Sequence, residues 1–133
     1  MNPDKKTDPL AALISSDAKA VDRAQLAELL GPFMVIDQNS KDFGFLPALR
    51  EVDGNGTKIE ILLAGAKARA LYFNLPDGLL PMEIIAAGLM PEGSVKTSLK
   101  KLFDAHVVNK DKKGRYFLPA HHVADLFKRL NSK

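Results

Sequence analysis

The chain has 133 residues, of which 46% are hydrophobic and 26% are charged, an ordinary balance for one globular domain with an accessory element. It contains no cysteine, which excludes disulfides and thiolate metal sites. No window approaches the roughly 18 uncharged apolar residues of a membrane span, and the opening MNPDKKTDPL lacks the apolar run of a secretory signal. A cytoplasmic location away from membranes is therefore expected.

The net charge of +3 is unevenly distributed along the chain. Residues 1–74 carry 9 lysines and arginines against 10 acidic residues, whereas residues 75–133 carry 10 against 6. Within 93–115 the numbers are 7 and 2. Such a local excess is typical of a surface that meets a polyanion, although solvent-facing helices carry similar lysines.

The first 56 residues are predicted to form a flexible end and a small accessory element. Residues 1–9 are expected to form a flexible end, and 10–56 are expected to hold helix and strand, beginning with one or two helical turns at 10–14. Asp22 and Gln25 have the spacing of a capping box before RAQLAELLG, and the Gly-Pro pair that follows predicts the end of that helix.

The rest of this element is predicted to be extended. FMVID is expected to form a strand and QNSKD a turn. Pro47 limits FGFLPALREV to an edge strand or an irregular segment. DGNG at 53–56 is expected to be a loop.

A long helix is predicted after this loop. Thr57 and Glu60 form a second capping-box pattern, and strong helix formers follow. Gly65 predicts a close helix–helix contact. Apolar residues recur on one helical face at positions 59, 62, 63, 66, 70 and 73.

Two helices are predicted between 81 and 106. MEIIAAGLM forms a short helix between Pro81 and Pro91, and PEG forms a tight turn. Ser94 is expected to cap the next helix, which runs to about His106. The inward positions of that helix are Val95, Leu99, Leu102 and Phe103.

The remaining residues predict a β-hairpin and an amphipathic helix. HVVNKDKKGRYFLP contains two strands around a charged turn that includes Gly114. AHHVADLFKRLNSK follows, with an apolar stripe that packs within the monomer or forms a homodimer contact. The stripe comprises Val123, Leu126, Phe127 and Leu130.

The order from 57 onward resembles the winged helix-turn-helix superfamily, which includes MarR-like and related prokaryotic regulators. The residues that carry the resemblance are MEIIAAGLMPEGSVKTSLKKLFDAHVV and NKDKKGRYFLP, about half of the chain with the helix before them. The resemblance implies an α+β, mostly helical protein, with a winged helix domain at 57–133 and the 10–56 element as its N-terminal extension.

The resemblance also implies binding to double-stranded DNA, most simply by a transcriptional regulator. Helix 94–105 would be the recognition helix in the major groove, and hairpin 108–118 would be the wing on the backbone or in the minor groove. The DNA-binding residues expected on this basis are Ser94, Lys96, Thr97, Lys100, Lys101, Lys110, Lys112, Lys113 and Arg115.

Two other functions are compatible with the same residues. One is a winged-helix module that binds proteins within a larger assembly, with an apolar patch around Phe33, Phe43 and Phe45. The other is a replication or plasmid-maintenance protein, which shares the DNA chemistry. The base-reading part of helix 94–105 has no arginine, asparagine or glutamine, so specificity is expected either to depend on dimer spacing and DNA shape or to be weak.

Enzymatic and cofactor-dependent functions are not expected. The acidic residues near DGNG lack a calcium-loop pattern, and GNG is not a phosphate-binding fingerprint. His121 and His122 are adjacent, so they cannot bind one metal ion from positions i and i+4 of a helix. His106 is expected on the inner side of its helix as a structural residue.

Overall fold

The computed structural model describes residues 9–10 and 20–132, so the predictions for 1–9 and 10–14 fall largely outside the described residues. The described part is α+β and mostly helical, with two separate antiparallel hairpins, which confirms the expected class. In chain order the elements are α3 (Arg23–Leu30), β1 (Met34–Ile36), β2 (Phe43–Phe45), α4 (Pro47–Arg50), α5 (Asn55–Phe73), α6 (Pro81–Ala86), α7 (Glu92–Asp104), β3 (Asn109–Lys110), β4 (Tyr116–Phe117) and α8 (Ala120–Asn131).

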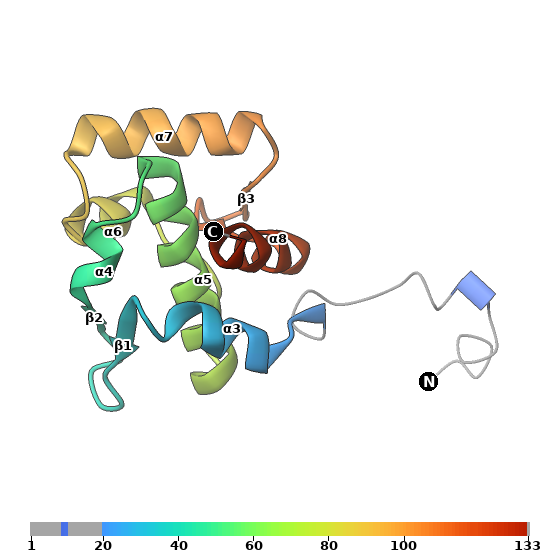
Figure 1. Ribbon diagram of the computed structural model, residues 1–133. Helices are drawn as coiled ribbons and strands as arrows, with labels where there is room; N and C mark the ends of the chain where they lie inside the picture. The colour runs from blue at the N-terminus through green and yellow to red at the C-terminus, as the bar shows by residue number, and fades with distance from the viewer. Residues whose placement is uncertain (1–8, 11–19, 133) are drawn as a thin grey trace.

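Helix α5 is the centre of the molecule (Figure 1). Helix α7 lies across one end of α5, whereas α3 and hairpin β1–β2 lie towards its other end, and α8 runs beside it. The sequence predicted one apolar face for this helix, but every residue from Ile59 to Lys67 is buried. Because neighbours surround α5, apolar side chains cover most of its circumference.

Helix α5 begins earlier than predicted. Its first residue is Asn55, and Gly54 precedes it with a φ of 90°, a conformation that favours glycine. The predicted DGNG loop therefore ends at Gly54. The capping box predicted for Thr57 and Glu60 is wrong, because both residues lie inside the helix and the Glu60 carboxylate pairs elsewhere.

Hairpin β1–β2 packs on α5 at Gly65. Met34 pairs with Phe45 and Ile36 with Phe43 across the hairpin. A Cβ atom at position 65 would collide with the Met34 sulfur and lie 3.4 Å from the Phe43 ring. Gly65 does permit a close approach, but the partner is the hairpin and not a second helix.

Two other segments differ from the sequence predictions. Pro47 begins the four-residue helix α4, where its fixed φ and missing N–H are tolerated. Helix α7 begins at Glu92 after an extended Pro91, so the last two residues of the predicted PEG turn are already helical and Ser94 is not the N-cap. By contrast, the Asp22 carboxylate accepts the Gln25 N–H at 3.0 Å, which confirms the predicted N-cap of α3.

Helix α8 directs its apolar stripe into the monomer. Val123 and Leu126 are buried, and Phe127 and Leu130 pack against the same core. Helix α8 contacts α3 and α5. The three phenylalanines expected to form an apolar docking patch, at positions 33, 43 and 45, are also partly buried against this core.

Within the described residues, no helix is both long enough and apolar enough to cross a membrane.

Candidate nucleic-acid interface

Helix α7 presents one face to the core and one to solvent. Val95 and Leu99 are buried against the core, as predicted. Lys96, Lys100 and Lys101 are exposed on the rest of the helix. Ser94 is partly buried, and it is the third residue of the helix and not its cap.

Two of these lysines have acidic partners on the same helix. The Lys96 ammonium lies 4.0 Å from the Glu92 carboxylate, and the Lys100 ammonium lies 2.9 Å from the Asp104 carboxylate. All four side chains are more than half exposed. Exposed pairs with this spacing contribute only about 0.3–0.5 kcal/mol, so a polyanion can displace the acidic partners.

Thr97 is also engaged within the helix. Its hydroxyl donates a hydrogen bond to the Gly93 carbonyl at 3.0 Å, one turn earlier. The hydroxyl proton is therefore occupied, and the methyl group is the part of this side chain left for an apolar contact. The sequence could not show this bond, because threonine makes it only inside a formed helix.

Hairpin β3–β4 projects beside α7, and its turn is closed by Asp111. The Asp111 carboxylate accepts the backbone N–H of Lys113 at 2.8 Å and of Arg115 at 2.9 Å. These bonds, that from Arg115 foremost, hold the pKa of Asp111 below its usual value. Lys112 and Lys113 are exposed at the tip, whereas Arg115 is half-buried. The hairpin predicted at 108–118 is thus present, with strands of two residues each.

An aromatic contact joins the hairpin to α7. The rings of Phe103 and Tyr116 meet edge to face with centroids 5.8 Å apart, and the Lys110 ammonium lies about equally far from both, at 5.5 and 5.6 Å. Phe103 is 39% exposed, so its predicted inward position is wrong. It lies seven residues after Lys96, and that spacing places it on the same side of the helix.

The loop before α6 fixes the hairpin to the rest of the protein. Leu79 and Tyr116 exchange two backbone hydrogen bonds, of 2.9 and 2.8 Å, as an antiparallel bridge. Gly78 has a φ of 86°, and a Cβ there would lie 2.6 Å from the Tyr116 carbonyl oxygen. Only glycine therefore permits this close approach of the loop to β4.

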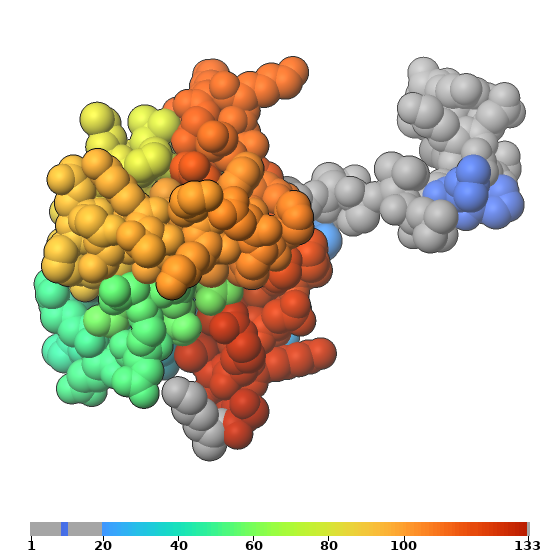
Figure 2. Space-filling model, turned by 90° about the horizontal axis from the view of Figure 1, so that it is seen from above, coloured from blue at the N-terminus to red at the C-terminus, as the bar shows by residue number. Residues whose placement is uncertain are grey.

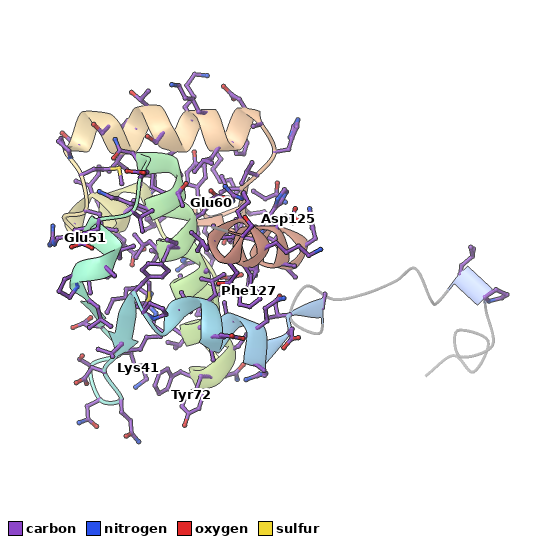
Figure 3. All side chains as sticks on the ribbon, viewed as in Figure 1. Lys41, Glu51, Glu60, Tyr72, Asp125 and Phe127 are labelled. Atoms are coloured by element: carbon purple, nitrogen blue, oxygen red, sulfur yellow. The ribbon has the colours of Figure 1, made fainter. Side chains whose placement is uncertain are left out.

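Figure 2, seen from above, shows α7 in gold and orange, with hairpin β3–β4 rising on one side and α8, in red, on the other. The basic end of α8 is linked to α5 by the Arg129 guanidinium, which donates to the Glu60 carboxylate at 2.6 Å. Figure 3 shows Glu60 on α5 close to α8. Burial raises the pKa of Glu60, and the hydrogen bond from Arg129 opposes that rise.

The histidines lie in two places, after α7 and at the start of α8. His106 is exposed and follows α7 with a φ of 61°, so the predicted inner position is wrong. His121 and His122 lie with ring centroids 4.2 Å apart, and His122 faces Asp125 at 3.7 Å. Over residues 9–10 and 20–132, no three side chains of histidine, cysteine, aspartate or glutamate are grouped so that they could hold a metal ion.

Comparisons with protein-family models, with curated proteins and with solved structures find no match for this chain.

Proposed function

We propose that this protein binds double-stranded DNA through a winged helix-turn-helix and acts as a transcriptional regulator. In this arrangement α6 braces α7, α7 enters the major groove, and hairpin β3–β4 is the wing that contacts the backbone or the minor groove. An α-helix of ordinary diameter fits the major groove, and α7 has 13 residues, with both ends of its outer face in solvent.

The observation that carries the proposal is the common face of two basic elements. Figure 2 shows α7 and hairpin β3–β4 side by side, and the contact of Lys110 with Phe103 joins them. Both elements carry exposed lysines, at positions 96, 100 and 101 and at positions 112 and 113. Lysines that only solvate a helix need no second basic element beside them. A duplex, in contrast, presents phosphates on both sides of each groove.

The contacts of α7 suggest how the work is divided among its residues. Lys96 is exposed near the N-terminal end of the helix, where base edges are expected, and Thr97 offers a methyl group suited to a thymine methyl. Lys100 and Lys101 lie further along the helix, where phosphates are nearer. This small reading set favours recognition of DNA shape alongside a few base contacts.

A salt titration tests the proposal. The binding constant is measured by fluorescence anisotropy with a random duplex of about 25 base pairs over a range of salt concentrations. A plot of log K against log salt concentration should have a slope of roughly −4 to −6, because each phosphate contact contributes about −0.9. Absence of binding at low salt would overturn the proposal and favour a protein-docking module.

A triple variant tests the role of α7 in the same assay. Lys96→Ala, Lys100→Ala and Lys101→Ala together should weaken DNA binding and flatten the salt slope by roughly 2 to 3, with little change in thermal stability because all three side chains are exposed. Unaltered affinity would remove α7 from the interface. A homodimer on a palindromic site remains a prediction, and it needs a surface other than the stripe of α8 that the core covers.

A further inference from the structure

The most deeply buried charge among the described residues is Lys67, in the second half of α5, with 2% of its side chain exposed. Its ammonium lies 2.5 Å from Oδ2 of Asp77, in the loop after α5. Burying an ammonium group is unfavourable unless it is paired and hydrogen-bonded. The Lys67 side chain is buried whereas that of Asp77 is 29% exposed, so the pair lies at the edge of the protein interior.

A cavity of about 690 Å³ opens beside this pair, within the size range of sites that bind small molecules. One wall is apolar and comes from α5 and the loop after it. The charged residues of the lining come from four segments: α3, α5, the loop after α5 and the turn between β3 and β4. The lining residues are Arg23, Lys67, Ala70, Leu71, Asn74, Leu75, Pro76, Asp77, Asp111 and Phe117.

One part of this cavity is suited to a cation. Oδ1 of Asp77 is buried and accepts no hydrogen bond from the described residues, although buried acceptors nearly always have a donor. The Asp111 side chain lies on the same lining, as does the ring of Phe117, with the Lys67 ammonium 5.7 Å from its centre. An ammonium or amidinium group supplies the donor that Oδ1 of Asp77 lacks, and Asp111 adds a second negative charge for it.

Another part is suited to an anion. The Arg23 guanidinium is exposed at the start of α3, and its hydrogen bond within the protein is a long one, 3.5 Å, to the Leu71 carbonyl. Arginine recognises carboxylate and phosphate groups through its planar set of donors. Leu71 and Pro76, on the same lining, offer apolar contact.

We propose that this cavity binds a small amphoteric molecule: an ammonium or amidinium group at Asp77 and Asp111, an anionic group at Arg23, and an apolar body against Leu71 and Phe117. The site is separate from the outer face of α7. Asp111 and Phe117 belong to hairpin β3–β4, so the bound molecule also contacts the wing. Any effect on DNA affinity rests on the proposed function, whereas binding itself does not.

The test uses three probes of matched length and the full chain without DNA. 5-Aminopentanoate carries both charges, pentanoate carries only the anion, and pentylamine carries only the cation. Titrations followed by backbone amide NMR should show shifts at Leu71, Asp77 and Phe117, with a Kd of about 1 mM for 5-aminopentanoate, as expected for so small a ligand. Each single-charge probe should bind at least about tenfold more weakly.

Equal binding of the three probes would overturn the amphoteric assignment, and absence of shifts at these residues would overturn the site. Neither result depends on DNA, so failure of this inference is distinguishable from failure of the proposed function.

An arginine pair provides the variant and its control. Arg23→Gln should weaken the binding of 5-aminopentanoate by about tenfold and leave the binding of pentylamine unchanged, because the substitution removes only the partner of the anionic group. The matched control is Arg50→Gln, since the Arg50 guanidinium likewise donates to one carbonyl, that of Gly88 at 3.3 Å, and lies outside the cavity lining. Both arginines are exposed, so these variants should fold, whereas a change at Asp77 would leave Lys67 without this partner. Unchanged binding in Arg23→Gln would overturn the role of Arg23.

Discussion

The turns of hairpins β1–β2 and β3–β4 each contain an aspartate whose carboxylate accepts hydrogen bonds from two backbone N–H groups. Asp37 accepts from Asn39 and Ser40, both at 2.8 Å, much as Asp111 accepts from Lys113 and Arg115. In both cases backbone donors hold the pKa of the aspartate below its usual value. The two turns therefore share their local chemistry.

The hairpins differ in charge and in what they contact. The first turn, DQNSKD, has one lysine and two aspartates, whereas the second, DKKGR, has three basic residues and one aspartate. Phe43 of the first hairpin faces α5, with the Arg69 guanidinium 4.4 Å from the centre of its ring. The second hairpin leaves its basic tip in solvent beside α7. Two turns of similar chemistry thus belong to hairpins with different roles: β1–β2 packs on the core, and β3–β4 is a candidate DNA contact.

The hairpins also dock on different kinds of neighbour. The first meets Gly65 with the flexible end of Met34, whereas the second meets Gly78 with the backbone carbonyl of Tyr116. A side chain can move aside, but a backbone carbonyl in a paired strand cannot move without breaking the pairing. Substitutions at the two glycines should therefore differ in their effects.

Replacing Gly78 by alanine should have the largest effect. The added methyl group overlaps the Tyr116 carbonyl, and the positive φ is unfavourable for alanine. The free energy of unfolding, measured by urea denaturation, should fall by about 3 kcal/mol. Gly88→Ala is the control, since Gly88 has a φ of 71° with open space around it, and it should lose only about 1 kcal/mol. Equal losses would mean that the approach of the loop to β4 is not a tight one.

Removing positive charge from the second hairpin should have the next largest effect. This change should lower the affinity for DNA and leave the free energy of unfolding unchanged. Lys112→Ala with Lys113→Ala should weaken DNA binding by about 30-fold near physiological salt, which is about 2 kcal/mol, if each lysine contacts one phosphate. The control is Gln38→Glu with Asn39→Glu, which lowers the net charge by the same amount on the first hairpin. The substituted positions of both hairpins are exposed. Anisotropy titrations should show little change for that control, and equal losses would point to net charge without a local contact.

Replacing Gly65 by alanine should have a smaller effect. The methyl group collides with the Met34 sulfur, but alanine also favours the helical state by about 1 kcal/mol. The net loss in unfolding free energy should stay near 1 kcal/mol, and Met34→Ala in the same chain should remove the collision part of it. Additive effects of the two changes, measured by urea denaturation as a double-mutant cycle, would show that residues 34 and 65 do not interact.

Acid should loosen both turns in the same direction. The ionised carboxylates accept the turn N–H groups, so the lowered pKa values stabilise the folded hairpins above the usual aspartate pKa of about 4. That stabilisation is lost as the pH falls through the lowered values. Amide NMR should show Asn39 and Ser40 in the first turn, and Lys113 and Arg115 in the second, shifting together below that pH.

A variant separates the two turns in that experiment. Asp111→Asn should abolish the acid transition at Lys113 and Arg115 and leave the transition in the first turn intact. If the first turn changes as well, the two hairpins are coupled through α5.

The sequence predicted local features well where one short-range effect decides the structure. Asp22 caps α3 as its spacing suggested, and the hairpin around Gly114 forms because turn and strand preferences agree. Thr57 and Ser94 also have the composition of N-caps, yet both helices begin earlier, after Gly54 and Pro91. The backbone conformation at those two residues sets the start without any side-chain cap.

The non-local features of the molecule had no sequence signal. Lys67 pairs with Asp77, and Glu60 pairs with Arg129 on another helix 69 residues away. On a helical wheel, both α5 residues interrupt an apolar pattern and would ordinarily be assigned to solvent. Similarly, the placement of Phe103 against Tyr116 depends on where the hairpin docks, which no periodicity within α7 determines.

The pairing of Glu60 with Arg129 has a consequence for the order in which the protein forms. During synthesis α3 and α5 leave the ribosome well before α8. The Glu60 carboxylate therefore has no Arg129 guanidinium to pair with until α8 has been synthesised. Leu126 of α8 completes the same core. Contacts this distant along the chain slow folding, because a long loop must close before they contribute. The nascent chain is therefore expected to remain incompletely folded until α8 has left the exit tunnel.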